Sequence, residues 1–113
     1  MSQNITGGCA CGQVRYDLAD RPIFQIRCHC DDCRKASGSA FADVLMVASD
    51  RLAVSGTEPK AYTVKADSGR SMSRAFCGAC GSPVLIRRVA TSLAAFLQAG
   101  SLDDPSLFKP QVV

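Results

Sequence analysis

Apolar residues occur in short runs along this chain, and turn-forming residues separate one run from the next. The longest continuously apolar run covers residues 41–48, a pattern typical of a strand that is buried on both faces. Further short or alternating apolar segments that predict strands lie at residues 14–16, 23–27, 52–55, 61–64, 71–76, 83–88 and 94–100. Short strands at regular spacing, with turns such as Gly56–Pro59 between them, predict a mainly β domain.

A single short helix is predicted to follow residue 30. Asp31 and Asp32 stand in its first turn, where the helix dipole favours negative charge. Gly38 provides a stop signal, because glycine readily adopts the left-handed conformation that ends a helix. Beyond the last predicted strand, residues 101–105 predict a turn.

Length and cysteine content limit the class of protein. A chain of 113 residues fits one domain and no linker divides it, so we expect a single domain over residues 1–113. A domain of this size has a modest core, and small domains often add disulfides or a metal ion. The seven cysteines are the candidates for either kind of cross-link.

The cellular compartment decides between disulfides and metal. The start of the chain, MSQNITGG, has neither a basic segment nor an apolar run, so we do not expect a signal peptide. We therefore expect a cytoplasmic protein, whose thiols stay reduced. An odd number of cysteines also fits a closed disulfide framework poorly. Metal binding is the favoured interpretation.

The charge pattern and the short length of the apolar runs argue against two classes of partner. The formal net charge is +3, the basic residues are scattered, and the chain has no tryptophan. A nucleic-acid groove usually needs a clustered basic face with stacking rings, so no nucleic-acid partner is expected. No stretch approaches the roughly 18 apolar residues of a membrane span, so no membrane partner is expected either.

The cysteines form a C-x-C pair, a C-x-C-x-x-C triplet and a C-x-x-C pair: Cys9 and Cys11; Cys28, Cys30 and Cys33; Cys77 and Cys80. Gly81 permits a tight turn whose N–H groups point at the sulfurs of the last pair, and Gly12 can do the same for the first. Structural zinc takes four ligands, so the simplest partition joins the two pairs and leaves the triplet as a second site. Spacing alone leaves open that the triplet shares ligands with either pair, or that one site is vacant.

The triplet has the composition of an open zinc site. Three ligands leave a fourth position free, as in catalytic zinc sites, although a second structural site would have the same spacing. Three thiolates donate charge to the ion, which makes it a poor acidifier of water but a soft acceptor for a further thiolate. The triplet therefore indicates thiol chemistry more than hydrolysis.

Charged neighbours of the triplet are further candidates. Arg27 and Arg34 border it and could offset its charge or hold an anionic ligand. His29, the one histidine, lies between two of the cysteines and is a candidate proton carrier or fourth ligand. The alternative is that His29 packs or hydrogen-bonds nearby.

Four segments together suggest a relationship to a known family. They are Gly7–Gly12 (GGCACG), Cys28–Gly38 (CHCDDCRKASG), Phe76–Pro83 (FCGACGSP) and Ala99–Pro105 (AGSLDDP). With these motifs in this order, the chain resembles the glutathione-dependent formaldehyde-activating family over most of its length. The resemblance implies a fold of the Mss4-like (β-tent) type, with zinc-bound antiparallel sheets and one short helix.

The resemblance also implies two zinc sites and a reaction. It implies a structural zinc on Cys9, Cys11, Cys77 and Cys80, and a second, catalytic zinc on Cys28, Cys30 and Cys33. It implies a carbon–sulfur lyase that forms S-hydroxymethylglutathione from glutathione and formaldehyde, with glutathione as the small thiol partner. The alternative is a non-catalytic zinc-binding interaction module of the same fold, since a fold does not fix a function.

Overall fold

The computed structural model describes residues 4–65, 69–89 and 93–111, and it contains strands, one α-helix and short 3₁₀ turns. The strands and the helix follow one another in the order β1 (Ile5–Gly8), β2 (Val14–Leu18), β3 (Phe24–Cys28), α1 (Asp31–Ser37), β4 (Ala42–Ala48), β5 (Leu52–Gly56), β6 (Lys60–Lys65), β7 (Ser71–Phe76), β8 (Pro83–Arg88) and β9 (Ala94–Gln98). Three 3₁₀ turns lie at Ser49–Arg51, Ala99–Ser101 and Pro105–Leu107. The predicted mainly β fold with one short helix is confirmed.

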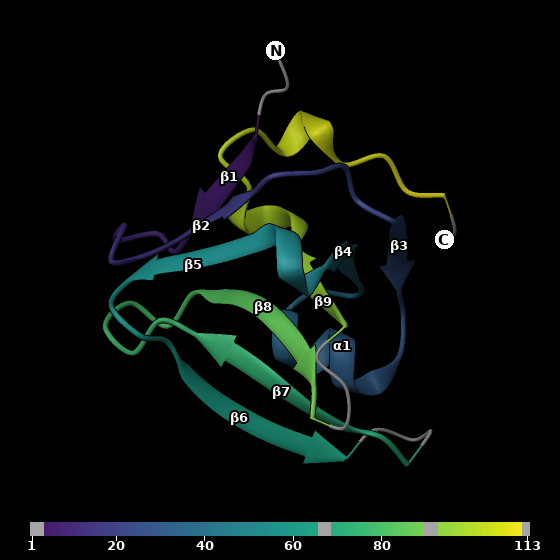
Figure 1. The fold of residues 1–113 in the computed structure, drawn as a ribbon. Helices are drawn as coiled ribbons and strands as arrows, with labels where there is room; N and C mark the ends of the chain where they lie inside the picture. Colours follow the sequence, from purple (N-terminus) through teal and green to yellow (C-terminus); the bar gives the residue numbers. More distant parts are fainter. Residues whose placement is uncertain (1–3, 66–68, 90–92, 112–113) are drawn as a thin grey trace.

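The strands form two antiparallel sheets (Figure 1). The smaller sheet has the order β1-β2-β5, and the larger has the order β3-β4-β9-β8-β7-β6. Every strand pairing within them is antiparallel. Antiparallel neighbours need only short connections, which agrees with the turn residues seen between the apolar runs.

The main core lies between the two sheets. Strand β2 alternates buried and partly buried residues, and its inward side chains are those of Val14, Tyr16 and Leu18. They pack in one cluster with inward residues of the larger sheet, such as Leu45 and Leu97. Burial of these apolar side chains provides most of the force that holds the sheets together.

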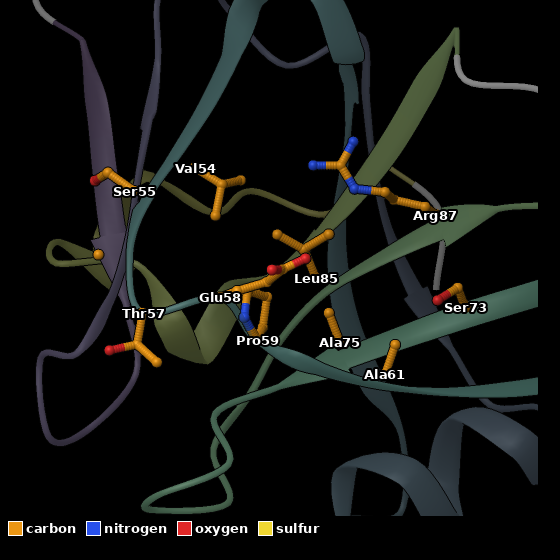
Figure 2. A pocket seen from close by; sticks show the side chains of 11 residues that line it. Val54, Ser55, Thr57, Glu58, Pro59, Ala61, Ser73, Ala75, Leu85 and Arg87 are labelled. Atoms are coloured by element: carbon orange, nitrogen blue, oxygen red, sulfur yellow. The ribbon is translucent and has the colours of Figure 1, made fainter.

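A hollow of about 420 Å³ remains where the two sheets diverge. Figure 2 shows Val54 of β5 and Leu85 of β8 facing this hollow, with Glu58 and Arg87 at its edge. None of its described lining residues is a cysteine. The hollow is therefore separate from the thiol chemistry that the sequence predicts.

The other face of the larger sheet carries helix α1. Cys33 of the helix packs with Ala42 and Val44 of β4 and with Ile86 of β8. Strand β4 thus contributes to both clusters, because Leu45 faces the smaller sheet while Val44 faces the helix. This agrees with the prediction that residues 41–48 are buried on both faces.

Helix α1 begins and ends where the sequence predicts. The sulfur of Cys30 caps its start by accepting the backbone N–H of Cys33 at 3.4 Å. Gly38 ends it in the left-handed region with φ 69°, and its N–H donates to the carbonyl of Arg34. The helix therefore holds two of the three triplet cysteines at fixed positions.

Strand β1 is an element that the pattern of apolar residues does not predict. Its two glycines, Gly7 and Gly8, are poor strand formers. The structure explains Gly7, because a Cβ there would overlap the Tyr16 hydroxyl and the Ser101 carbonyl. The close approach of the Tyr16 hydroxyl and the Ser101 carbonyl therefore requires glycine at this position.

The predicted turn at residues 101–105 is confirmed, and it connects to the smaller sheet. Leu102 forms an isolated bridge with Gly7, and the backbone N–H of Asp103 donates to the Thr6 carbonyl at 3.0 Å. The adjoining Asp104 caps the last 3₁₀ turn through the backbone N–H of Ser106.

Within the described residues, no helix is long and apolar enough to span a membrane.

Candidate metal centres

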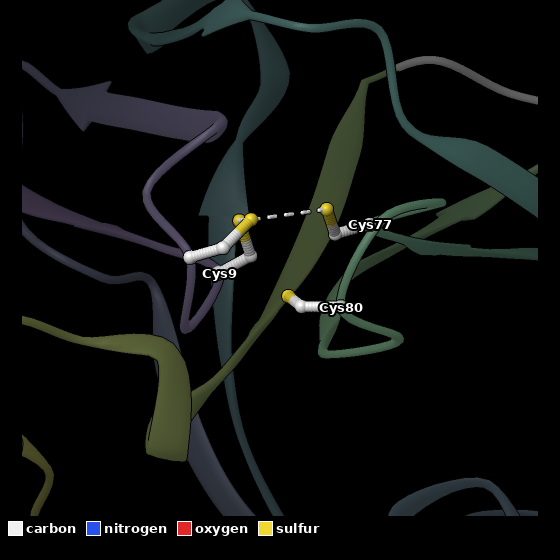
Figure 3. A group of neighbouring side chains, drawn as sticks. Cys9, Cys77 and Cys80 are labelled. Atoms are coloured by element: carbon white, nitrogen blue, oxygen red, sulfur yellow. Dashed lines mark hydrogen bonds between the residues drawn. The ribbon is translucent and has the colours of Figure 1, made fainter.

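Two turns from opposite sheets bring four sulfurs together (Figure 3). Cys9 and Cys11 lie on the turn between β1 and β2, and Cys77 and Cys80 lie on the turn between β7 and β8. The Sγ atoms of Cys9 and Cys11 are 3.5 Å apart, and those of Cys11 and Cys77 are 3.7 Å apart. All four sulfurs lie within 4.8 Å of one another. We call this set the clasp.

Two backbone turns that each end in a positive-φ glycine present the clasp sulfurs. Gly81 has φ 78° and donates its N–H to the Cys77 carbonyl at 2.8 Å, which closes the second turn. Gly12 has φ 81° and donates its N–H to the Cys9 carbonyl at 3.1 Å, which closes a turn one residue shorter. Both glycines thus play the part that the sequence predicts for them. In the second turn, the N–H of Ala79 points at the Cys77 sulfur at 3.4 Å.

Local hydrogen bonds favour the thiolate form of two clasp residues. The pKa of Cys80 is lowered to about 5, first because the Ser82 hydroxyl donates to its sulfur at 3.2 Å. The pKa of Cys9 is also lowered, first because the backbone N–H of Val14 donates to it at 3.2 Å. Since metals bind the thiolate and not the thiol, these contacts favour metal binding by Cys9 and Cys80.

The triplet gathers on the face of the larger sheet that carries α1, away from the smaller sheet. Cys28 ends β3, Cys30 caps α1, and Cys33 lies in the first turns of that helix. The Sγ atoms of Cys28 and Cys30 are 3.4 Å apart, and all three sulfurs lie within 4.8 Å of one another. Cys30 is exposed whereas Cys33 is buried, so the cluster has one open side.

The open side of the triplet faces a groove of about 260 Å³. Its apolar walls come from strands β3, β4, β7, β8 and β9, and they consist of Ile26, Val44, Met72, Ile86 and Phe96. Its charged lining residues in the described chain are Asp32, Arg70, Arg74 and Arg88. All three triplet cysteines line the same groove. A molecule bound in this groove would therefore contact the sulfurs directly.

Arg74 contacts one of the triplet sulfurs directly. Its Nη2 atom lies 4.0 Å from the sulfur of Cys33. Burial raises the pKa of Cys33 to about 12, while this contact with Arg74 acts in the opposite direction. The arginine thus offsets part of the charge that the triplet carries as thiolates.

Both clusters fit zinc in donor type and in spacing. Four sulfurs bound tetrahedrally at about 2.3 Å from one ion would lie roughly 3.8 Å from each other. The sulfur–sulfur distances of 3.4–3.7 Å match this spacing. Thiolate sets of this kind select soft or borderline cations over magnesium or calcium. The clusters could therefore hold two metal ions, one bound by the four sulfurs of the clasp and one bound by the three sulfurs of the triplet.

Comparison with known proteins decides the family. Residues 4–113 match the family described as "Glutathione-dependent formaldehyde-activating enzyme". The chain belongs to this formaldehyde-activating family. No curated protein matches the chain. A crystal structure of a Rhodobacter sphaeroides protein, a structural genomics target, has the same fold with a TM-score of 0.70 at 20% identity, and the match covers 96% of this chain and 99% of that one.

In this member of the formaldehyde-activating family, the charged neighbours predicted from sequence have other partners. Arg27 forms a two-point ion pair with Asp43, at 2.8 and 3.1 Å, and its guanidinium lies 4.1 Å from the centre of the Phe41 ring. Arg34 pairs with Asp31 on the exposed surface of α1. Neither arginine lines the groove in the described chain.

His29 lies beside the triplet of this family member but not in its donor set. Its ring makes an edge contact with Phe41, with the ring centres 5.9 Å apart. Among the described residues, the donors that gather at the triplet are the three sulfurs alone. This placement agrees with the alternative that His29 packs nearby.

Sequence reasoning missed the residues that face the triplet from β7 and β8. The strand register pairs Met72 with Arg88 and Arg74 with Ile86, so these four side chains share one face. Alternation within each strand could have grouped Met72 with Arg74. Only the fold reveals that this face lies opposite Cys33.

Proposed function

We propose that this chain is a zinc-dependent carbon–sulfur lyase that joins a small thiol to formaldehyde. Glutathione is the proposed thiol and S-hydroxymethylglutathione the product. The observation that carries the proposal is the unequal pair of sulfur clusters, one closed by four cysteines and one with three that face a groove. The family match over residues 4–113 supports the choice of substrates.

The two clusters receive different roles in this proposal. The clasp of Cys9, Cys11, Cys77 and Cys80 holds a structural zinc, because its four ligands leave no free position. The triplet of Cys28, Cys30 and Cys33 holds the catalytic zinc. Zinc bound there would supply a Lewis acid with an open fourth position, which favours the thiolate form of an entering thiol.

The reaction itself needs little beyond positioning. The sulfur lone pair forms the new carbon–sulfur bond, the carbonyl π pair moves to oxygen, and the thiol proton ends on that oxygen. Ile26, Val44 and Phe96 form apolar walls beside the reacting groups. Arg74 stays on Cys33 and balances the charge of the thiolates.

A single domain over residues 1–113 carries both sites in this proposal. We place it in the cytoplasm, because seven reduced cysteines and glutathione itself belong to a reducing compartment. The alternative is a non-catalytic zinc module of the same fold, in which the triplet only stabilises the chain.

Metal content is the first test of the proposed function. Protein purified without chelator should contain about two zinc ions per chain, since the two clusters each match one ion. Cys30→Ser should lower the content to about one. A folded wild-type protein with one zinc and a metal-free triplet would contradict the proposed mechanism.

The rate of adduct formation is the second test. Zinc-loaded protein should accelerate the reaction of glutathione with formaldehyde above the uncatalysed background, which proceeds without any protein. Cys30→Ser should reduce the rate to that background while the chain remains folded. An unchanged rate with fully loaded wild-type protein would favour the non-catalytic alternative.

A further inference from the structure

The groove beside the triplet has a cationic lining. Arg70, Arg74 and Arg88 line it, whereas Asp32 is the one acidic side chain of its described lining. A divalent ion held by three thiolates adds one net negative charge. The groove remains positive even when this centre is counted.

Arg74 has hydrogen-bonding groups that the described chain leaves without partners. Its Nη2 atom points to Cys33, but its Nε and Nη1 atoms are buried and make no hydrogen bond to any described residue. Buried polar groups without partners are rare in folded proteins and costly. Arg74 is among the residues that line the groove, and a carboxylate bound there would offer acceptors to these N–H groups once the side chain turns toward it.

Arg88 is held in place by an aromatic ring. Its guanidinium lies 5.8 Å from the centre of the Phe96 ring, and both residues line the groove. A guanidinium over a ring keeps its N–H edges free to bind a carboxylate at two points. The contact also reduces the side-chain freedom that a ligand would otherwise have to remove.

We propose that Arg74 and Arg88 make this groove selective for a small thiol that carries a carboxylate. The inference rests on the proposed function in that the thiol sulfur lies at the triplet. The groove of about 260 Å³ is smaller than most ligand pockets, so the thiol end and one carboxylate of a ligand enter while any remainder stays outside. Glutathione meets this description, and so do much smaller thiol acids.

Binding of matched thiols to the zinc-loaded protein tests the inference without any turnover. The probes are 3-mercaptopropionate, which has a carboxylate, and 2-mercaptoethanol, which has a hydroxyl in its place. Calorimetric titration should show roughly tenfold or tighter binding of the acid, the amount expected for one charge-assisted pair. Raising the salt concentration should narrow the difference.

Neighbouring arginines on one strand provide a matched pair of variants. Arg88→Gln should reduce the preference for the acid severalfold or more. Arg87→Gln, with the same charge change on the opposite face, should retain it, because Arg87 lines the other hollow. Arg74→Gln should weaken the preference as well, and Arg74→Lys should restore part of it. Zinc content and circular dichroism are measured first for each variant.

Equal affinity of the two thiols for folded, zinc-loaded wild type would overturn the inference. A preference that survives in both Arg88→Gln and Arg74→Gln would also overturn it. Lyase activity is a separate readout: a protein that accelerates adduct formation without preferring the acid contradicts only the carboxylate site. A protein that prefers the acid without accelerating the reaction contradicts only the proposed function.

Discussion

At the scale of single residues, Asp103 shows how one carboxylate joins distant segments. It accepts a hydrogen bond from the Thr6 hydroxyl at 2.7 Å and two from the guanidinium of Arg15. Thr6 lies on β1 and Arg15 on β2, so the C-terminal turn is tied to the smaller sheet. The Arg15 pair first, and the Thr6 hydroxyl second, lower the pKa of Asp103 from 3.8 to about 2.

The low pKa of Asp103 predicts how its contribution to stability depends on pH. The folded state favours the carboxylate, so its contribution is fully present above pH 3.8 and is lost as the pH falls toward 2. We expect Asp103→Asn to be less stable than wild type at pH 7, with a difference that narrows between about pH 4 and pH 2. Urea unfolding measures the difference at each pH in this range at which both proteins remain folded.

Asp20→Asn is the matched control for this prediction. Asp20 is exposed, and its carboxylate accepts a hydrogen bond from the backbone N–H of its own neighbour Arg21. Its substitution should change stability little at any pH. A difference between Asp103→Asn and wild type that stays constant down to pH 2 would contradict the role of the carboxylate charge.

At the scale of elements, helix α1 links backbone geometry to the triplet. The seven-residue helix is too short to be stable alone, so its caps and its packing on β4 determine whether it forms. It carries Cys33, and the cap residue Cys30 is itself a triplet member. Loss of helical order would therefore separate the triplet sulfurs.

The C-cap glycine tests this coupling. Gly38→Ala places a side chain at φ 69°, which costs about 1 kcal/mol because the left-handed conformation is strained for alanine. We expect unfolding free energy to fall by about that amount, and the triplet to release zinc to a competing chelator more readily than in wild type. Gly100→Ala is the control, since a Cβ there meets no neighbour and its φ is not positive. Equal zinc release by both variants would show that the order of α1 does not affect zinc binding at the triplet.

At the scale of the whole molecule, the clasp joins the two sheets at one end. Its pairs come from turns of different sheets, and Cys9 and Cys77 are buried in the main core. Closing so long a stretch of chain restricts the unfolded state strongly. Structural zinc contributes about 10 kcal/mol or more in small domains, which is comparable to the entire stability of a domain.

Two exposed cysteines allow the clasp and the triplet to be compared directly. Cys80→Ser removes a clasp ligand and Cys30→Ser removes a triplet ligand, and both positions are exposed. We expect Cys80→Ser to be unfolded already at about 37 °C, so that it shows no cooperative thermal transition above that temperature. Cys30→Ser should lose one zinc ion and unfold within a few degrees of the wild-type unfolding temperature. Calorimetry and metal analysis of the two variants make the comparison. Similar destabilisation of both would assign the triplet a structural role.

The outcome at particular residues shows what sequence could and could not reveal. The limits of α1 follow from Asp31 and Gly38, and the triplet follows from its spacing, because these signals are local. Spacing made the pairing of Cys9 and Cys11 with Cys77 and Cys80 only the simplest partition, and it is the fold that brings these two distant turns together. Strand β1 was missed because Gly7 is explained by its contact with Tyr16, a residue of another strand. The groove arginines were missed for the same reason, since the position of Arg74 opposite Cys33 depends on the pairing of β7 with β8.

The two clusters also differ in the length of chain that each encloses, and this bears on how the protein acquires metal during synthesis. The triplet lies within residues 28–33 and is complete early in translation, whereas the clasp needs residues 9–80. All three triplet cysteines are therefore present in the nascent chain well before the clasp cysteines are, and the clasp must also wait for two distant turns to meet. Synthesis thus completes the donor set of the triplet before that of the clasp.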